Sequence, residues 1–186
     1  MIGYALCGSF CTHAASLKTL ELLLAAGNDV LPIVSETAAS TDTRFGTAKN
    51  LLETLEQMTG RPPITTIREA EPLGPKIPLE ALIISPCTGN TLAKLAHGIT
   101  DTAVCMAAKA HLRCGRPVLI ALASNDALSA NLGNLALLLQ RKNVFFVPLS
   151  QDDPIQKPHS LVADFKKLPA AYTAMRAGKQ LRPLFL

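Results

Sequence analysis

The sequence predicts an α/β fold in which a parallel sheet is covered by helices on both faces, a three-layer αβα arrangement. Strand-like and helix-like segments alternate along all 186 residues, as they do in folds built from βαβ units. The strand-like segments are short, continuous apolar runs, which is typical of strands buried on both faces. No internal repeat is visible, and the length suits one domain spanning residues 1–186.

Local patterns place the individual elements. The first apolar run stops at Gly8, and the helix after it carries Leu17, Leu20 and Leu24 on one face and ends at Gly27. A Ser/Thr-rich loop is expected at residues 35–43, and a proline-rich segment without regular structure at residues 71–78. Strands are expected at residues 2–7, 30–34, 64–67, 81–85, 117–123 and 144–148. Helices are expected at residues 12–26, 44–58, 91–97, 102–114, 127–141 and 161–177.

Composition and charge exclude several classes of protein. The net charge is +4, and the chain has no Trp and two Tyr, whereas nucleic-acid binders gather basic residues and interleave them with aromatic ones. No apolar run reaches the roughly 18 residues of a membrane span, and no charged segment precedes the first run as in a signal peptide. The five cysteines lack the spacing of a disulfide scaffold or a zinc site. We therefore expect a cytoplasmic protein with reduced thiols and no metal, nucleic acid or membrane.

Ligands of parallel sheets bind beyond the carboxyl ends of the strands, so the residues that follow each strand are the candidate site. The first strand is followed by Gly8, Ser9 and Phe10, with Thr12 at the start of a helix. A glycine turn, hydroxyls and a helix N-terminus suit a single phosphate group. The segment is neither a G-x-G-x-x-G fingerprint nor a P-loop. In the alternative interpretation, Gly8 is only a turn and Thr12 only a helix cap.

Hydroxyl groups also follow the second strand. Ser35 and Thr37 come directly after it, and more hydroxyls lie at residues 40–43. They form either a second wall of a phosphate site or a solvated loop with a helix cap, and the two interpretations are compatible.

The third strand end is the most informative. It reads Pro86-Cys87-Thr88-Gly89-Asn90-Thr91, in which the Asn90 amide can both donate to and accept from the edge of a uracil-like ring. Thr91 can also cap the helix that follows. The fourth strand ends in Ser124 and Asn125. Small polar residues with few acids suit a flat ligand that bears a phosphate better than they suit a metal.

No nucleophilic triad is evident. Ser9 lacks the G-x-S-x-G context. His97 and His111 lie inside expected helices and are interpreted as surface or packing residues. His13 lies near the first turn, where it either contacts a ligand or faces solvent.

This set of strand ends resembles the homo-oligomeric flavin-containing cysteine decarboxylase family. Residues 86–91 are similar to that family's P-A-S-A-N-T motif, and the turn at Gly8 and the loop at Ser35 match its phosphate-binding positions. The resemblance extends over nearly the full chain. It is carried also by residues 40–46, 71–78, 106–110, 124–128 and 146–148.

The resemblance implies a flavodoxin-like or Rossmann-like fold, an FMN cofactor near an interface between copies of the chain, and a homo-oligomer that is a trimer or a dodecamer. Within the family, the chain most resembles a branch that oxidises a dihydrodipicolinate-type precursor to dipicolinic acid in spore-forming bacteria. That branch works with a second protein, its A subunit, which binds a nicotinamide such as NADP. FMN would act as hydride acceptor, and the protein would orient a small dicarboxylate. Arg44, Lys76 and Lys109 are the candidates for its two carboxylates; the alternative for each is a solvated surface charge.

The chain departs from the family pattern in two places. The decarboxylases use a histidine after the second strand, and residues 35–58 contain none, which argues against cysteine decarboxylation. Cys87-Thr88-Gly89 also replaces Ala-Ser-Ala in the motif. Two further functions therefore stay open. One is a non-catalytic binding or assembly role beside a nicotinamide-dependent partner, and the other, less favoured, is an FMN-dependent cysteine decarboxylase.

Overall fold

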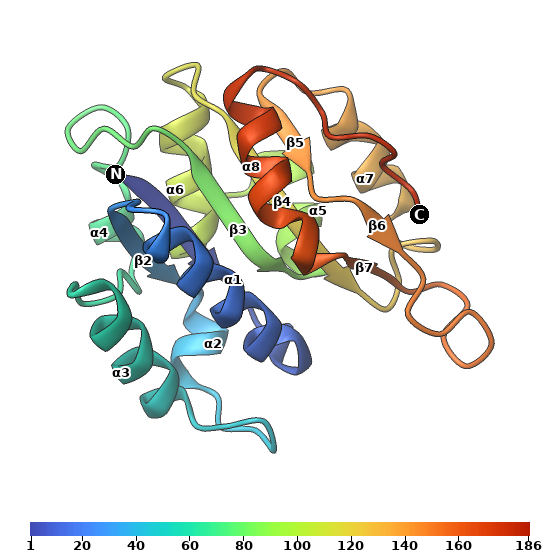
Figure 1. Cartoon of the computed structure of the whole chain (residues 1–186), viewed down its shortest axis with the longest axis horizontal. Coiled ribbons are helices and arrows are strands. Elements are labelled where there is room, and N and C mark those ends of the chain that lie inside the picture. Colours follow the sequence, from blue (N-terminus) through green and yellow to red (C-terminus); the bar gives the residue numbers. More distant parts are fainter.

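The computed structural model describes residues 1–186 and shows a sheet between two layers of helices (Figure 1). Neighbouring strands follow the order β2-β1-β3-β4-β7-β6, and β5 pairs with β4. The strands are β1 (Ile2–Leu6), β2 (Val30–Val34), β3 (Leu82–Cys87), β4 (Val118–Ser124), β5 (Val144–Phe146), β6 (Leu149–Ser150) and β7 (Leu161–Ala163). The α-helices are α1 (His13–Ala25), α2 (Glu36–Ser40), α3 (Ala48–Thr59), α4 (Ile67–Ala70), α5 (Gly89–His97), α6 (Ala103–Leu112), α7 (Leu132–Leu139) and α8 (Leu168–Arg176).

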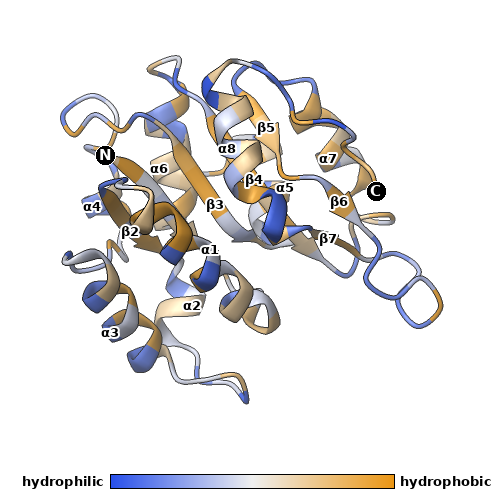
Figure 2. Cartoon of the chain, viewed as in Figure 1, coloured by the Kyte–Doolittle hydropathy of each residue, from blue (hydrophilic) through white to orange (hydrophobic).

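The sheet is mostly parallel, which confirms the predicted fold class. Strands β1 to β5 pair in parallel, and their residues are almost all buried, as the apolar centre of Figure 2 shows. The prediction is wrong at the far edge, where β6 and β7 pair in antiparallel fashion. The segment expected to be helical at residues 161–177 therefore begins as strand β7. Its helix α8 starts only at Leu168.

Other expected boundaries move, most of them because polar side chains bind the backbone. The loop at residues 35–43 contains helix α2, which starts where Ser35 Oγ accepts a hydrogen bond from the amide of Ala38 at 3.3 Å. Helix α3 starts at Ala48 because Thr47 caps it. Residues 64–67 form a single bridge between Ile64 and Ile33 and then enter α4. Helix α7 starts at Leu132 because turns occupy the residues before it.

A buried hydroxyl cluster ties the first layer of helices to the sheet. The Tyr4 hydroxyl donates to the carbonyl oxygen of Ser16 in α1 at 2.9 Å, and Ser16 Oγ donates to the carbonyl oxygen of Ser85 in β3 at 2.6 Å. Burial raises the pKa of Tyr4 to about 12, so the phenol stays neutral. The cluster fixes α1 against β1 and β3, the two strands whose ends carry the predicted motifs.

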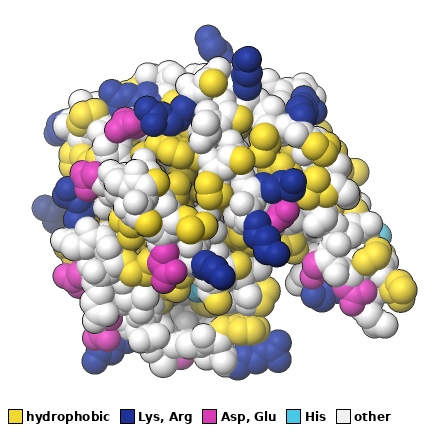
Figure 3. Space-filling view, in the orientation of Figure 1, with side chains coloured by type: hydrophobic (Ala, Val, Ile, Leu, Met, Phe, Trp, Pro, Cys, Tyr) yellow, Lys and Arg dark blue, Asp and Glu magenta, His cyan; other side chains and the backbone are white.

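The two layers separate the helices into groups. Helices α1 and α8 pack together on one face, while α5 contacts both α6 and α7 on the other. None of the helices combines the length and the apolar character that a membrane crossing requires. The loop between β6 and β7 projects away from the body of the molecule (Figures 1 and 3). It contains Ile155, an exposed apolar side chain.

Candidate functional site

The carboxyl ends of the first three strands meet at one edge of the sheet. A Cβ atom on Gly8, after β1, would lie 3.4 Å from Cγ2 of Thr37, after β2. Across the other side of β1, the Thr91 hydroxyl donates to Sγ of Cys7 at 3.3 Å. The ends of β1, β2 and β3 are thus in direct contact, as the parallel topology predicts.

The end of β4 joins the same edge through Gly89, the first residue of α5. A Cβ atom at this position would lie 2.5 Å from Oγ of Ser124, 2.7 Å from Nδ2 of Asn131 and 2.8 Å from Oδ1 of Asp126. Such approaches are closer than real Cβ contacts. Side chains at and after the end of β4 occupy the space that a methyl group at position 89 would need. This explains why the motif has glycine here, in Cys87-Thr88-Gly89, instead of the alanine of Ala-Ser-Ala.

A network of polar side chains lies beside Gly89 and extends from the predicted residue Ser124 to residues that sequence reasoning did not assign to the site. The Asp126 carboxylate accepts hydrogen bonds from the Ser124 hydroxyl and, at 2.9 Å, from Asn131 Nδ2. Asn134 Nδ2 donates to Asn131 Oδ1 at 2.9 Å, and a ring nitrogen of His97 lies 2.9 Å from Asn134 Oδ1. Hydrogen bonds, first of all that from Ser124, lower the pKa of Asp126, so its carboxylate is ionised at neutral pH. Three polar residues at positions 126, 131 and 134 were the available signal.

The N-terminus of α5 is capped by Thr88. Its Oγ1 accepts from the amide of Thr91 at 3.2 Å and lies 3.1 Å from the Thr91 hydroxyl. The expectation that Thr91 caps this helix is therefore wrong by three residues. The helix starts earlier because Thr88 has an extended backbone conformation, as N-cap residues do.

Replacing Thr88 with valine removes this cap while keeping the side-chain shape. We expect the free energy of unfolding to fall by about 1 kcal/mol, measured by urea denaturation. Thr100→Val is the control, because Thr100 is also half-buried but makes no side-chain hydrogen bond. Equal losses in the two variants would contradict the capping role.

The predicted site residues divide into those with free polar groups and those without. The side chains of Ser9, Thr37, Asn90 and Asn125 make no hydrogen bond within the chain and are at least partly exposed. The remaining hydroxyls are engaged by backbone or side-chain partners: Ser35, Thr88, Thr91 and Ser124. Pro86 and Cys87 are buried inside β3, and burial raises the pKa of the Cys87 thiol. The Cys87 side chain is part of the hydrophobic core, so its thiol is not offered to a ligand.

The end of β1 leads directly into a helix N-terminus. Ser9 occupies the cap position of a short 3-10 turn, Phe10–Thr12, that continues into α1, and it makes no side-chain cap bond. The Thr12 hydroxyl donates to the carbonyl oxygen of Ser9 at 2.8 Å, so it does not cap α1 either. The first amides of this helical segment lack a side-chain cap. This arrangement can bind one anion.

His13 is the histidine nearest to this edge. Its Nε2 lies 2.8 Å from the carbonyl oxygen of Cys7, and its ring centroid lies 5.3 Å from that of Phe10. Partial burial lowers its pKa, so the ring is neutral at pH 7. A neutral imidazole that donates from Nε2 has an acceptor at Nδ1. That atom has no partner in the chain and is not buried.

A small cavity of about 130 Å³ opens beside this turn, between α1 and the segment that enters α3. Phe10, His13 and Phe45 line it. The Arg44 guanidinium lies over the Phe45 ring with 4.8 Å from Cζ to the centroid, so Arg44 is at the rim of the cavity. Of the three predicted carboxylate-binding cations, Arg44 alone lies at this edge.

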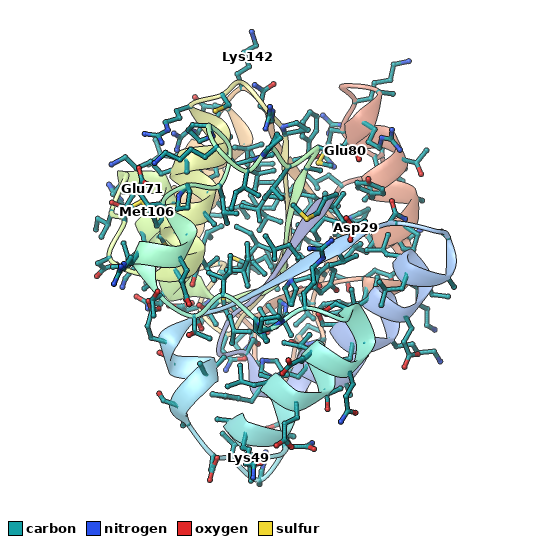
Figure 4. All side chains as sticks on the ribbon, turned by 90° about the vertical axis from the view of Figure 1, so that its left-hand side faces the viewer. Asp29, Lys49, Glu71, Glu80, Met106 and Lys142 are labelled. Atoms are coloured by element: carbon teal, nitrogen blue, oxygen red, sulfur yellow. The ribbon has the colours of Figure 1, made fainter.

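Lys76 and Lys109 lie elsewhere. Lys76 is in the loop before β3, which packs on the end of α6: a Cβ atom on Gly74 would lie 2.5 Å from the carbonyl oxygen of Ala110. Lys109 is on α6, one turn before the helix ends. In Figure 4, Glu71 and Met106 mark the side of the molecule formed by this loop and α6. Lys49, near the start of α3, marks the other end of the molecule, where the carboxyl ends of the strands lie. The structure does not bring the three cations together.

The groups at the edge suit a flat ligand with one phosphate. The uncapped helix start and the Ser9 hydroxyl offer donors to an anion, while the Asn90 and Asn125 amides offer paired donors and acceptors. No group of three His, Cys, Asp or Glu side chains is arranged to hold a metal. On the face shown in Figure 3, Lys and Arg side chains are scattered among acidic ones. The residues therefore fit a phosphate-bearing flavin.

Comparisons with known proteins agree with this geometry. The chain is 44% identical over 185 residues to the B subunit of dipicolinate synthase of Bacillus subtilis (strain 168), covering 100% of this chain and 92% of that protein. The crystal structure of the B subunit of dipicolinate synthase from Bacillus halodurans C matches with a TM-score of 0.91 and 40% identity, covering 100% of this chain and 95% of that one.

A more distant structure shares the fold. The FMN-dependent cysteine decarboxylase SpaF matches with a TM-score of 0.67 and 23% identity over 95% of each chain. A family model described as Flavoprotein matches residues 2–170, which supports a flavin cofactor and a redox-related role. The chain belongs to the Flavoprotein family.

Proposed function

We propose that this chain is the FMN-binding component of a dipicolinate synthase, an oxidoreductase that converts a dihydrodipicolinate-type precursor to dipicolinic acid during sporulation. The observation that carries the proposal is the convergence of four strand ends on one edge. There, Ser9, Asn90 and Asn125 present polar groups without partners in the chain. The full-length similarity to two dipicolinate synthase B subunits supports the substrate class.

The roles of the edge residues follow from their free groups. Gly8, Ser9 and Phe10, at the uncapped start of the α1 segment, hold the FMN phosphate, and Thr37 and Ser35 form the adjoining wall. Asn90 and Asn125 bind the polar edge of the isoalloxazine. Thr88, Thr91 and Ser124 act mainly by fixing the backbone, because their hydroxyls have partners in the chain.

Substrate binding is assigned to the rim of the small cavity. FMN, when bound, supplies a hydride acceptor. Arg44 is exposed, forms no ion pair and stacks on Phe45, so its guanidinium can take a substrate carboxylate in two parallel hydrogen bonds. The neutral His13 ring, which donates from Nε2 to Cys7, can accept a proton at Nδ1.

The complete enzyme is proposed to contain more than this chain. A homo-oligomer, trimeric or dodecameric, would bring the flavin near an interface between copies in the cytoplasm, and the A subunit of the synthase would bring NADP. A second function is favoured by one observation: four of the predicted site hydroxyls are already engaged within the chain. In that case the chain holds substrate or stabilises the assembly, and the A subunit carries out the redox step.

A visible spectrum of the purified chain distinguishes these functions. We expect a yellow protein, or one that takes up added FMN in a 1:1 complex, whose flavin absorbance bleaches when the precursor is added without oxygen. Ser9→Ala should weaken FMN binding more than riboflavin binding, because it removes a phosphate donor. A colourless chain that takes up no FMN, with or without the A subunit, would contradict the flavin assignment and leave the assembly role.

A further inference from the structure

A second cavity lies on the opposite face of the sheet from α1. It has a volume of about 240 Å³ and lies between α5, α6 and the residues that follow α7. Its walls are mainly apolar, formed by Leu95, Ile99 and Leu112, with Cys105 also in the lining. None of the residues that line the cavity follows a strand end, and Leu95 lies about 9 Å along α5 from Gly89, so the cavity has a lining separate from that of the strand-end site.

Two cations stand at this apolar cavity without an acidic partner. Lys109 on α6 and Arg141 after α7 both line it, and neither forms a salt bridge. No Asp or Glu is among the lining residues. The nearby Lys94 is paired with Asp101 at 2.8 Å, so its charge is compensated. An apolar cavity with two uncompensated positive charges is complementary to an apolar anion.

Arg141 is held in place within the cavity wall. Its Nη1 donates to the carbonyl oxygen of Leu95 at 3.2 Å, at the last turn of α5. The other guanidinium nitrogens form no hydrogen bond or ion pair within the chain, and they keep the fork geometry that binds carboxylates in a bidentate manner. Burial raises the pKa of the Cys105 thiol, so the thiol is uncharged and does not repel an anion.

We propose that this cavity is a binding site for a single-ring aromatic carboxylate, with the ring between Leu95, Ile99 and Leu112 and the carboxylate on Arg141 and Lys109. The volume is below the roughly 300–1,000 Å³ of pockets for drug-sized ligands, which limits the apolar part to about one ring. Lys109, which the sequence offered as a candidate for a substrate carboxylate, would here bind a carboxylate in a cavity away from the strand-end site. The proposal does not depend on flavin binding.

The test is an NMR titration of the full chain with benzene-1,3-dicarboxylate, which lacks the ring nitrogen that makes pyridine dicarboxylates strong chelators. Benzyl alcohol, which has the same ring without a charge, is the neutral comparison. We expect methyl shifts at Leu95, Ile99 and Leu112 with the dicarboxylate and much weaker ones with the alcohol. Lys109→Ala and Arg141→Ala should each weaken binding by about tenfold, which corresponds to about 1.4 kcal/mol.

Lys142→Ala is the matched control, because Lys142 is the neighbouring cation, is exposed (Figure 4) and does not line the cavity. Its affinity should equal that of the unchanged chain. Shifts at Asn90 and Asn125 instead of the cavity methyls would place the ligand at the strand-end site and overturn the proposal. Equal binding of benzyl alcohol would also overturn it. The same holds if sedimentation shows a dimer and the dicarboxylate causes no shifts of the cavity methyl groups.

Discussion

Between pH 6.5 and pH 4, the unchanged chain is expected to lose about 3 kcal/mol more of its free energy of unfolding than the variant His111→Gln. His111 is fully buried in α6, with Nε2 2.9 Å from the carbonyl oxygen of Pro117 and Nδ1 without a partner. Burial, opposed in part by that hydrogen bond, lowers its pKa from 6.5 to about 4. Protonation therefore costs more in the folded state than in the unfolded one.

Stability falls with pH because His111 is protonated in the unfolded chain before it is protonated in the folded chain. As the pH falls below 6.5, the unfolded chain binds a proton at this position while the folded chain does not, so stability decreases until the pH reaches about 4. Glutamine keeps an N–H donor toward Pro117 but does not titrate. Urea unfolding of both proteins at pH 7.5, 6.5, 5 and 4 measures the difference, from which the other titrating groups cancel. Parallel pH profiles would show that His111 is protonated as easily when folded as when unfolded.

Gly89→Ala is expected to weaken FMN binding by at least about tenfold and to lower the free energy of unfolding by about 1–3 kcal/mol. The added methyl group would meet Ser124, Asn131 and Asp126 at 2.5–2.8 Å. These side chains cannot move freely because they are hydrogen-bonded to one another. The start of α5 must shift instead, and Asn90 shifts with it. Flavin titration by fluorescence quenching and urea unfolding give the two readouts.

Gly133→Ala is a matched control for this variant. Gly133 is also a helical glycine, near the start of α7, but a Cβ atom there meets nothing within 4 Å. Alanine favours helix over glycine by about 1 kcal/mol, so this variant should be at least as stable as the unchanged chain and bind FMN normally. If Gly89→Ala behaved in the same way, the edge would be more adaptable than the contacts indicate.

Several parts of the fold could be predicted because they depend on local patterns. The strands β1, β2 and β4 are continuous apolar runs, which are typical of parallel strands buried on both faces. Their observed positions are within one or two residues of the expected ones. The ends of α3 and α5 follow from Gly60 and Gly98, which adopt the left-handed conformation. The convergence of the strand ends follows from parallel topology alone.

The β6–β7 hairpin was not predictable in the same way. Its strands contain only two and three residues, and the apolar run at residues 161–163 is equally compatible with the start of a helix. Pairing with the end of β4 decides the conformation, because Ala123 and Ser124 lie opposite Val162 and Leu161. Such a tertiary contact leaves no periodic signal in the sequence.

The candidate site also combines features that the sequence predicts with features that only tertiary contacts decide. Ser9, Asn90 and Asn125 are at strand ends and could be identified from position. Whether a hydroxyl is free, however, depends on its neighbours, and Ser124 is engaged by Asp126. Lys76 and Lys109 stand out in the sequence by their charge, which carries no information about location in a fold.

Two of the edge strands, β2 and β6, pair in part with segments that are not themselves regular strands. At one edge, Ile64 exchanges hydrogen bonds with β2, through its amide to Pro32 at 3.0 Å and its carbonyl to Val34 at 2.8 Å. At the other, the amide of Leu149 in β6 donates to Leu184 at 2.7 Å, and the amide of Leu186 donates back to Leu149 at 2.9 Å. Open strand edges are templates for aggregation. In β5, the third edge strand, the Gln180 side chain bonds both the amide and the carbonyl of Phe146. Few backbone groups of the edge strands are therefore left open, and the fold opposes strand-to-strand growth into fibres.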